Sequence, residues 1–115
     1  GIARLRKIID SKATLIKKAI GAVTVDFELT DTTLRFPWFN QALDHETLEA
    51  VLSLITALCH HAKEVKYVTA REKPVENEKF AFRVFLIRLG FVGDNYKRVR
   101  KILLRNLTGN AAFKH

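Results

Sequence analysis

The spacing of apolar residues changes along the chain from helical to strand-like and back again, and this change restricts the folds available to it. Over residues 23–30 apolar and polar residues alternate strictly, which is typical of a half-buried β-strand. The apolar members of this run are Val23, Val25, Phe27 and Leu29. The segments on both sides carry apolar residues three or four positions apart, as amphipathic helices do. We therefore expect an α+β fold, in which a small antiparallel β-hairpin packs with about four α-helices.

Caps, turn residues and helix-ending glycines set the bounds of the other expected elements. The sequence predicts a helix at 3–20 ended by Gly21, a turn at 30–33, a strand at 34–36, and helices at 45–66, 78–89 and 95–107. Asp44, Asn77 and Asp94 are the expected N-caps of the last three helices. Residues 67–76 are expected to form a loop, unless Tyr67–Thr69 adds a short strand to the hairpin. The C-terminal half should therefore be helical.

The length and cysteine content favour a single cytoplasmic domain. The 115 residues suit one hydrophobic core, so residues 1–115 are treated as one domain. No apolar run approaches the roughly 18 residues of a membrane span. Cys59 is the only cysteine and lies on the apolar stripe of the 45–66 helix, which predicts a structural thiol in a reducing compartment. Because methionine is absent, even at position 1, we expect the chain to be a fragment of a longer protein.

Charge is distributed unevenly along the chain, whose formal net charge is +8. Residues 1–20 carry a net charge of +5, residues 21–70 carry −4, and residues 71–115 carry +7. A basic face can form only where the two basic ends of the chain meet. Polyanions are the natural partners of such a face, with nucleic acid first among them.

The last two predicted helices carry the functional prediction. Lys97, Lys101 and Arg105 are four residues apart and so share one helix face. Residues 95–115 contain six Lys and Arg residues and no Asp or Glu. The expected nucleic-acid-binding residues are Lys79, Arg83, Arg88, Lys97, Arg98, Arg100, Lys101 and Arg105. Such a cluster would neutralise backbone phosphates and release counterions, which favours a nucleic-acid-binding module.

Three other interpretations of this half of the chain stay open. The cationic residues could simply form a solvated helix face. The 78–89 helix is apolar on nearly all sides, so it could instead pair with another chain as a protein-interaction or oligomerisation domain. A helix–turn–helix is disfavoured, because Leu86 and Leu89 stand where that motif usually has a small residue.

No set of residues indicates catalysis, so the expected function is non-enzymatic, with no cofactor and no metal. His60 and His61 are adjacent and would point about 100° apart on a helix, which does not suit one metal ion. Asp26 and Glu28 are expected on the exposed face of the strand. The aromatic cluster around Pro37 is more consistent with packing than with stacking of nucleic-acid bases.

The second half of the sequence resembles the C-terminal region of the "virulence-related" proteins found on conjugative transposons and other mobile elements of low-GC Gram-positive bacteria. The resemblance rests on NEKFAFR (77–83), RLGFVG (88–93), YKRVRKILL (96–104) and GNAAFK (109–114), with weaker likeness at LIKKAIG (15–21). It implies a cytoplasmic protein of a mobile element, for which DNA is a more natural partner than RNA. It implies no catalytic, cofactor-binding or metal-binding residues.

Overall fold

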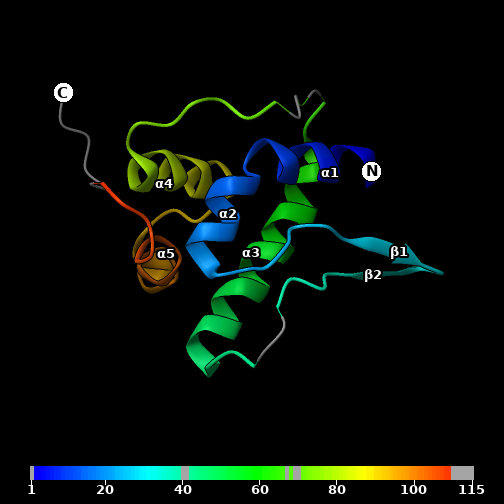
Figure 1. The fold of residues 1–115 in the computed structure, drawn as a ribbon, viewed down its shortest axis with the longest axis horizontal. Coiled ribbons are helices and arrows are strands. Elements are labelled where there is room, and N and C mark those ends of the chain that lie inside the picture. The colour runs from blue at the N-terminus through cyan, green and yellow to red at the C-terminus, as the bar shows by residue number, and fades with distance from the viewer. Residues whose placement is uncertain (1, 40–41, 67, 69–70, 110–115) are drawn as a thin grey trace.

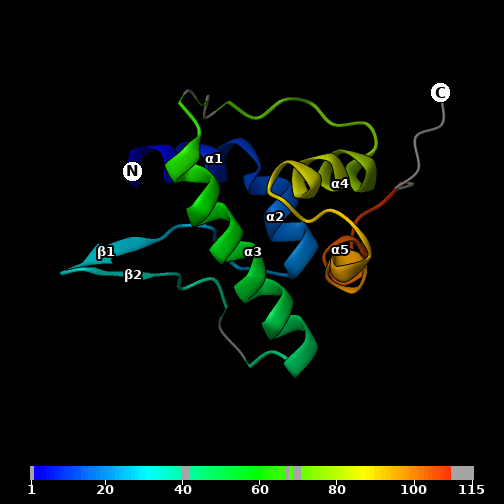
Figure 2. The same cartoon turned by 180° about the vertical axis from the view of Figure 1, so that it is seen from behind.

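The computed structural model describes residues 2–39, 42–66, 68 and 71–109. The elements are α1 (Ile2–Ser11), α2 (Ala13–Ile20), β1 (Glu28–Thr30), β2 (Thr33–Arg35), α3 (His45–Glu64), α4 (Glu78–Arg88), a 3₁₀ turn (Asp94–Tyr96) and α5 (Lys97–Leu104). The predicted α+β class is confirmed, since an antiparallel hairpin packs with helices. Figures 1 and 2 show α4 and α5 on one side of α3, with the hairpin extending on the other.

The predicted 3–20 helix is two helices that meet at Lys12. This residue has φ −127° and ψ 16°, outside the helical region, and its N–H donates to the carbonyl of Ile9 at 3.0 Å. The Ser11 hydroxyl donates to the carbonyl of Ile8 at 2.7 Å, a local bond that competes with regular helix geometry. The break lets α1 pack on α3 while α2 turns toward α5. Gly21 ends α2 in the left-handed conformation, as predicted.

The hairpin is shorter than the alternation predicts. Leu29 pairs with Leu34, and Asp31 adopts a positive φ of 53° at the two-residue turn. Residues before β1 have no ladder partner, although two of the expected inward residues, Val25 and Phe27, are buried. The indole N–H of Trp38 donates to the carbonyl of Asp26 at 2.9 Å and closes the base of the hairpin. Tertiary contacts thus replace the predicted strand pairing near the core.

Helix α3 runs through the core and contacts both α1 and α5. Its buried residues are Ala50, Val51, Leu54, Leu58 and Ala62. The predicted apolar stripe is wrong at its N-terminal end, where Leu48 and Leu52 are 42% and 53% exposed.

The connection from α4 to α5 follows the predicted stop signals. Asn77 caps α4 by accepting a hydrogen bond from the Phe80 N–H at 3.0 Å. At the other end Gly90 has φ 107°, and the Phe91 N–H donates to the Leu86 carbonyl, so the two residues form a Schellman motif. The chain then makes a 3₁₀ turn, so α5 begins at Lys97, two residues later than predicted. The last three residues of the predicted helix, 105–107, lie beyond the end of α5.

The described residues test one further expectation and leave a second one untested. The helical spacing of Tyr96 with Val99 and Leu103 predicts that its side chain points inward. This prediction is wrong, since Tyr96 is 42% exposed, although its ring contacts Phe91 edge-on at 5.5 Å between centroids. The suggested strand at Tyr67–Thr69 lies largely outside the described residues. Among the helices that are described, none is both long and apolar enough to cross a membrane.

Candidate nucleic-acid interface

Helix α5 presents four of the predicted basic residues on its outer side. Arg98, Lys101 and Arg105 line one surface pocket of about 250 Å³, together with Ile102 and with Glu46 from α3. Lys97 lies one turn before Lys101 and is also exposed. We call Lys97, Arg98, Lys101 and Arg105 the α5 face. Helical spacing brings these residues together as predicted, because α5 is regular from residue 97 to residue 104.

The N-terminal turn of α3 contacts one edge of the α5 face. Arg98 forms an ion pair with Glu46, and Arg105 Nη2 donates to Thr47 Oγ1 at 2.8 Å. Neither Lys97 nor Lys101 makes an ion pair or side-chain hydrogen bond with any described residue. Asp44 also interacts electrostatically with Arg105, and Glu49 lines a neighbouring pocket with Arg98, whereas Lys97 and Lys101 have no carboxylate partner among the described residues. The acidic middle of the chain therefore neutralises the α5 face only in part.

Arg100 lies on a different side of α5 from the other basic residues. Its Nη1 donates to the carbonyls of Phe91 at 2.9 Å and Gly93 at 3.0 Å. These bonds hold the turn that precedes α5 against the helix itself. Because its donors are directed at backbone carbonyls within the protein, we place Arg100 outside the α5 face.

The predicted residues on α4 are divided between two flanks of that helix. Lys79 and Arg83 are half-buried and about 40° apart around the helix axis. Arg88 is about 180° from Lys79 and lines a separate cavity with Lys12. The structure therefore brings together four of the eight predicted residues. Arg88 does not extend the α5 face because it lies on a different flank of α4 from Lys79. The total charge does not reveal this separation.

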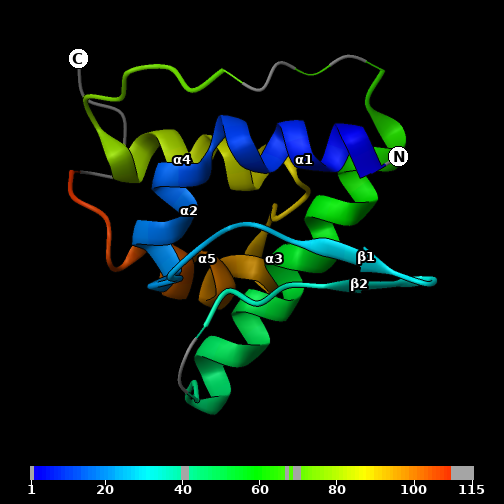
Figure 3. The same ribbon diagram turned by 45° about the vertical axis from the view of Figure 1, so that its right-hand side comes forward.

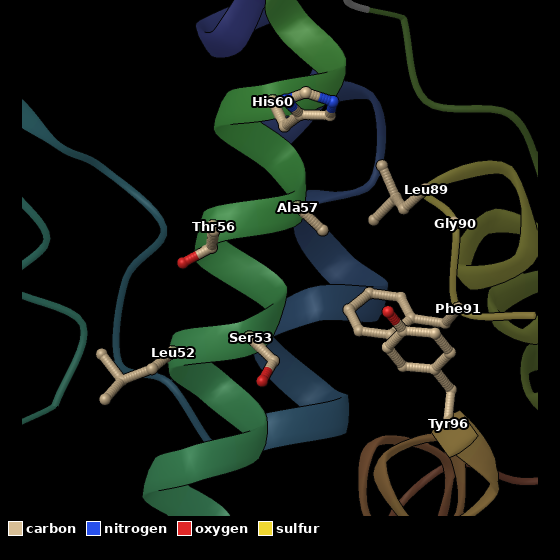
Figure 4. A pocket seen from close by; sticks show the side chains of 9 residues that line it. All are labelled: Leu52, Ser53, Thr56, Ala57, His60, Leu89, Gly90, Phe91 and Tyr96. Carbon is tan, nitrogen blue, oxygen red and sulfur yellow. The ribbon is translucent and has the colours of Figure 1, made fainter.

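A second surface feature is an apolar groove of about 450 Å³ between α3 and residues 89–96. Figure 4 shows the rings of Phe91 and Tyr96 on one wall and the side chains of Ala57 and His60 on the α3 wall. Leu52 also lines the groove. The 78–89 helix was expected to carry surplus apolar surface, but no large apolar residue of α4 is exposed. Among the exposed apolar residues, Leu52 of α3 and Tyr96 of the turn before α5 are the ones that line this groove.

Residues considered for chemistry have ordinary structural surroundings. Cys59 is half-buried, and burial raises the pKa of its thiol, which makes the reactive thiolate scarcer. Trp38 is buried, and Phe36 packs against both it and Phe27, with ring centroids 5.4 and 5.5 Å away. Within the described ranges no group of three or more His, Cys, Asp and Glu side chains could hold a metal ion.

Comparison of this chain with protein-family models, with curated proteins and with solved structures found no match.

Proposed function

We propose that this protein is a non-enzymatic nucleic-acid-binding module that contacts the phosphate backbone through the α5 face. The observation that supports this proposal is that Lys97 and Lys101 lie one helical turn apart on α5, both exposed and without an ion pair to any described residue. Phosphate contacts position a protein on nucleic acid without reading its sequence. The α5 face should therefore bind with little sequence preference and with an affinity that falls as salt is added.

DNA is the proposed partner, in line with the resemblance to proteins of conjugative transposons. That resemblance also leads us to propose a cytoplasmic protein of a mobile element. The α5 face itself offers only cationic side chains and Ile102, with no aromatic ring for stacking on unpaired bases. Duplex DNA, whose phosphates are densely spaced, fits such a surface better than a single strand does.

Fluorescence anisotropy with a labelled duplex tests this proposal. Lys97→Glu with Lys101→Glu changes the two residues of the α5 face that have no partner in the described structure, so the fold should be unaffected. We expect this variant to lose binding. A control variant, Lys7→Glu with Lys66→Glu, makes the same change in net charge at exposed residues elsewhere. Equal losses in the two variants, or unchanged binding in the first, would contradict the proposal.

The apolar groove supports a second candidate function, a protein-interaction or oligomerisation domain. Leu52 is 53% exposed and Tyr96 is 42% exposed at its rim. Sedimentation velocity distinguishes the two candidates. A concentration-dependent dimer that Leu52→Lys abolishes, with no salt-dependent affinity for DNA, would favour the interaction domain.

A further inference from the structure

A basic cavity of about 220 Å³ lies away from the α5 face and shares no residue with it. It is bounded by the junction of α1 and α2, the end of α3, the segment that leads to α4, and α4 itself. Figure 3 shows the described part of that segment, residues 71–77, crossing above α4. The polar and charged side chains that line the cavity are Ser11, Lys12, His61, Arg71, Lys73 and Arg88.

Cations from distant parts of the sequence meet in this cavity. Lys12 comes from the break between α1 and α2, Lys73 from the segment before α4, and Arg88 from the last turn of α4. None of these three side chains forms an ion pair with a described residue. Bringing like charges together costs free energy. An anionic ligand that bound among them would recover that cost.

The surroundings of Lys12 show how poorly this charge is compensated. Burial lowers the pKa of its ammonium group, and the positive charges of Arg88 and Lys73 lower it further. The negative charge of Glu72 raises the pKa of Lys12, but this is the smallest of the four effects on that pKa. Glu72 instead accepts hydrogen bonds from the N–H and hydroxyl of Thr14, both at 3.2 Å, at the start of α2.

We propose that this cavity binds a phosphoryl dianion, either as free phosphate or as the phosphate group of a small monoester. A phosphate monoester carries close to two negative charges and three strong acceptor oxygens, which suits several donors better than a carboxylate does. The planar guanidinium of Arg88 can bind two phosphate oxygens at once, and the Lys12 ammonium adds a flexible donor. The Ser11 hydroxyl donates to the Ile8 carbonyl, so the site depends on the cations and His61.

The shape of the cavity limits the size of the ligand. Its volume is below the roughly 300–1,000 Å³ of pockets that hold drug-sized molecules. The apolar side chains of Ile8, Val65, Val68 and Phe85 form another wall of the cavity. The Lys12 ammonium lies 5.7 Å from the centroid of the Phe85 ring. A small organic group attached to the phosphate would contact this wall, so an aromatic monoester should bind more tightly than free phosphate.

Isothermal titration calorimetry with inorganic phosphate and with phenyl phosphate, at constant ionic strength, tests the proposal and distinguishes the two sources. We expect both to bind, phenyl phosphate more tightly, and Lys12→Gln or Arg88→Gln to weaken each by about tenfold. Lys12→Arg, which keeps the charge, should retain binding. Lys7→Gln, a matched change at an exposed site on α1, should have no effect. Tighter binding of free phosphate would exclude the ester form.

A measurement without ligand guards against a simple loss of folding. Because Lys12 is repelled by Arg88 and Lys73, Lys12→Gln should keep or raise the melting temperature in low salt without phosphate. It should also reduce the rise in melting temperature that phosphate causes in the wild-type protein. The proposal would be overturned if phosphate raised the melting temperature of the wild type and of Lys12→Gln equally. It would also be overturned if chloride at the same ionic strength raised the melting temperature as much as phosphate does. The DNA-binding test on Lys97 and Lys101 is independent of this result.

Discussion

Glu78 joins three segments of the chain at a single carboxylate. One oxygen, Oε2, accepts from Lys18 of α2 at 2.8 Å, and the other accepts from the N–H and hydroxyl of Thr108. In addition, the Lys79 N–H donates a hydrogen bond to the Thr108 carbonyl at 2.9 Å. These donors lower the pKa of Glu78 to about 2, with the Lys18 hydrogen bond as the largest cause. Glu78 thereby ties the start of α4 to α2 and to the segment after α5.

Substituting Glu78 by Gln should alter how stability depends on pH. Its pKa in the folded protein lies below the ordinary value of 4.5, so the carboxylate stabilises the fold fully above about pH 4.5 and progressively less as pH falls toward 2. Glu78→Gln should therefore be less stable than the wild type at pH 7, and the two should converge near pH 2. Urea unfolding between pH 2 and pH 7 measures this difference.

The control for that measurement is Glu76→Gln, at an exposed neighbour that forms no ion pair with a described residue. Its free energy of unfolding should follow the wild-type curve at every pH. If the free energy of unfolding of Glu78→Gln had the same pH dependence as that of the wild type, the proposed junction of α4, α2 and Thr108 would be wrong.

At the scale of elements, the turn between α4 and α5 depends on Arg100. Loss of its two bonds to backbone carbonyls should destabilise the protein by about 1–2 kcal/mol in Arg100→Gln. Lys101→Gln removes the same charge from the next residue, which has no partner among the described side chains, and should leave stability unchanged. Thermal unfolding of the two variants provides the comparison. Equal stability would mean that Arg100 does not support the turn.

The approach of Gly109 to Asn77 couples the end of the described chain to the cap of α4. A Cβ atom at Gly109 would lie 2.2 Å from Asn77 Oδ1, the atom that accepts the Phe80 N–H. Gly90 has a similar positive φ, but a Cβ there would meet nothing within 4 Å. Gly109→Ala should therefore cost more stability than Gly90→Ala, by about 1 kcal/mol for the lost cap.

Chemical denaturation of the two alanine variants measures this difference directly. Both carry the backbone strain of a positive φ, so that strain cancels in the comparison. If Gly90→Ala were the less stable of the two, the contact between Gly109 and the α4 cap would not exist as described.

Local signals predicted the elements that are set by neighbouring residues. Gly21, Asn77 and Gly90 end or begin helices where expected, because caps and left-handed glycines act within one helical turn. The break at Lys12 was missed because α1 and α2 pack on different helices, and no local pattern specifies that. The hairpin was predicted too long because Val25 and Phe27 are buried by tertiary contacts and not by strand pairing.

The candidate sites also combine features that local sequence predicts with features that depend on the fold. Lys97, Lys101 and Arg105 could be grouped from their spacing, because four-residue intervals on one helix guarantee a shared face. Their contact with Glu46 and Thr47 depends on the packing of α5 on α3 and could not be predicted. The basic cavity joins Lys12 to Lys73 and Arg88, more than 60 residues further along the chain, so only the fold reveals it.

For the molecule as a whole, two basic ends and an acidic middle fold into two separate cationic sites. The α5 face lies on one helix and touches the acidic segment through Glu46, whereas the cavity around Lys12 gathers cations from distant segments and is also lined by apolar side chains. A row of cations along a helix suits the repeated charges of a polyanion, and cations that converge on one small cavity suit a single small anion. The central claim is that the α5 face contacts DNA phosphates.

The salt dependence of duplex binding tests that claim most directly. The two unpaired lysines, Lys97 and Lys101, predict a slope of log affinity against log salt of about −2, and Lys97→Gln with Lys101→Gln should bring it close to zero. The control Lys7→Gln with Lys66→Gln should keep the wild-type slope. A slope near zero in the wild type, or the same slope in the α5 variant and the wild type, would contradict the claim.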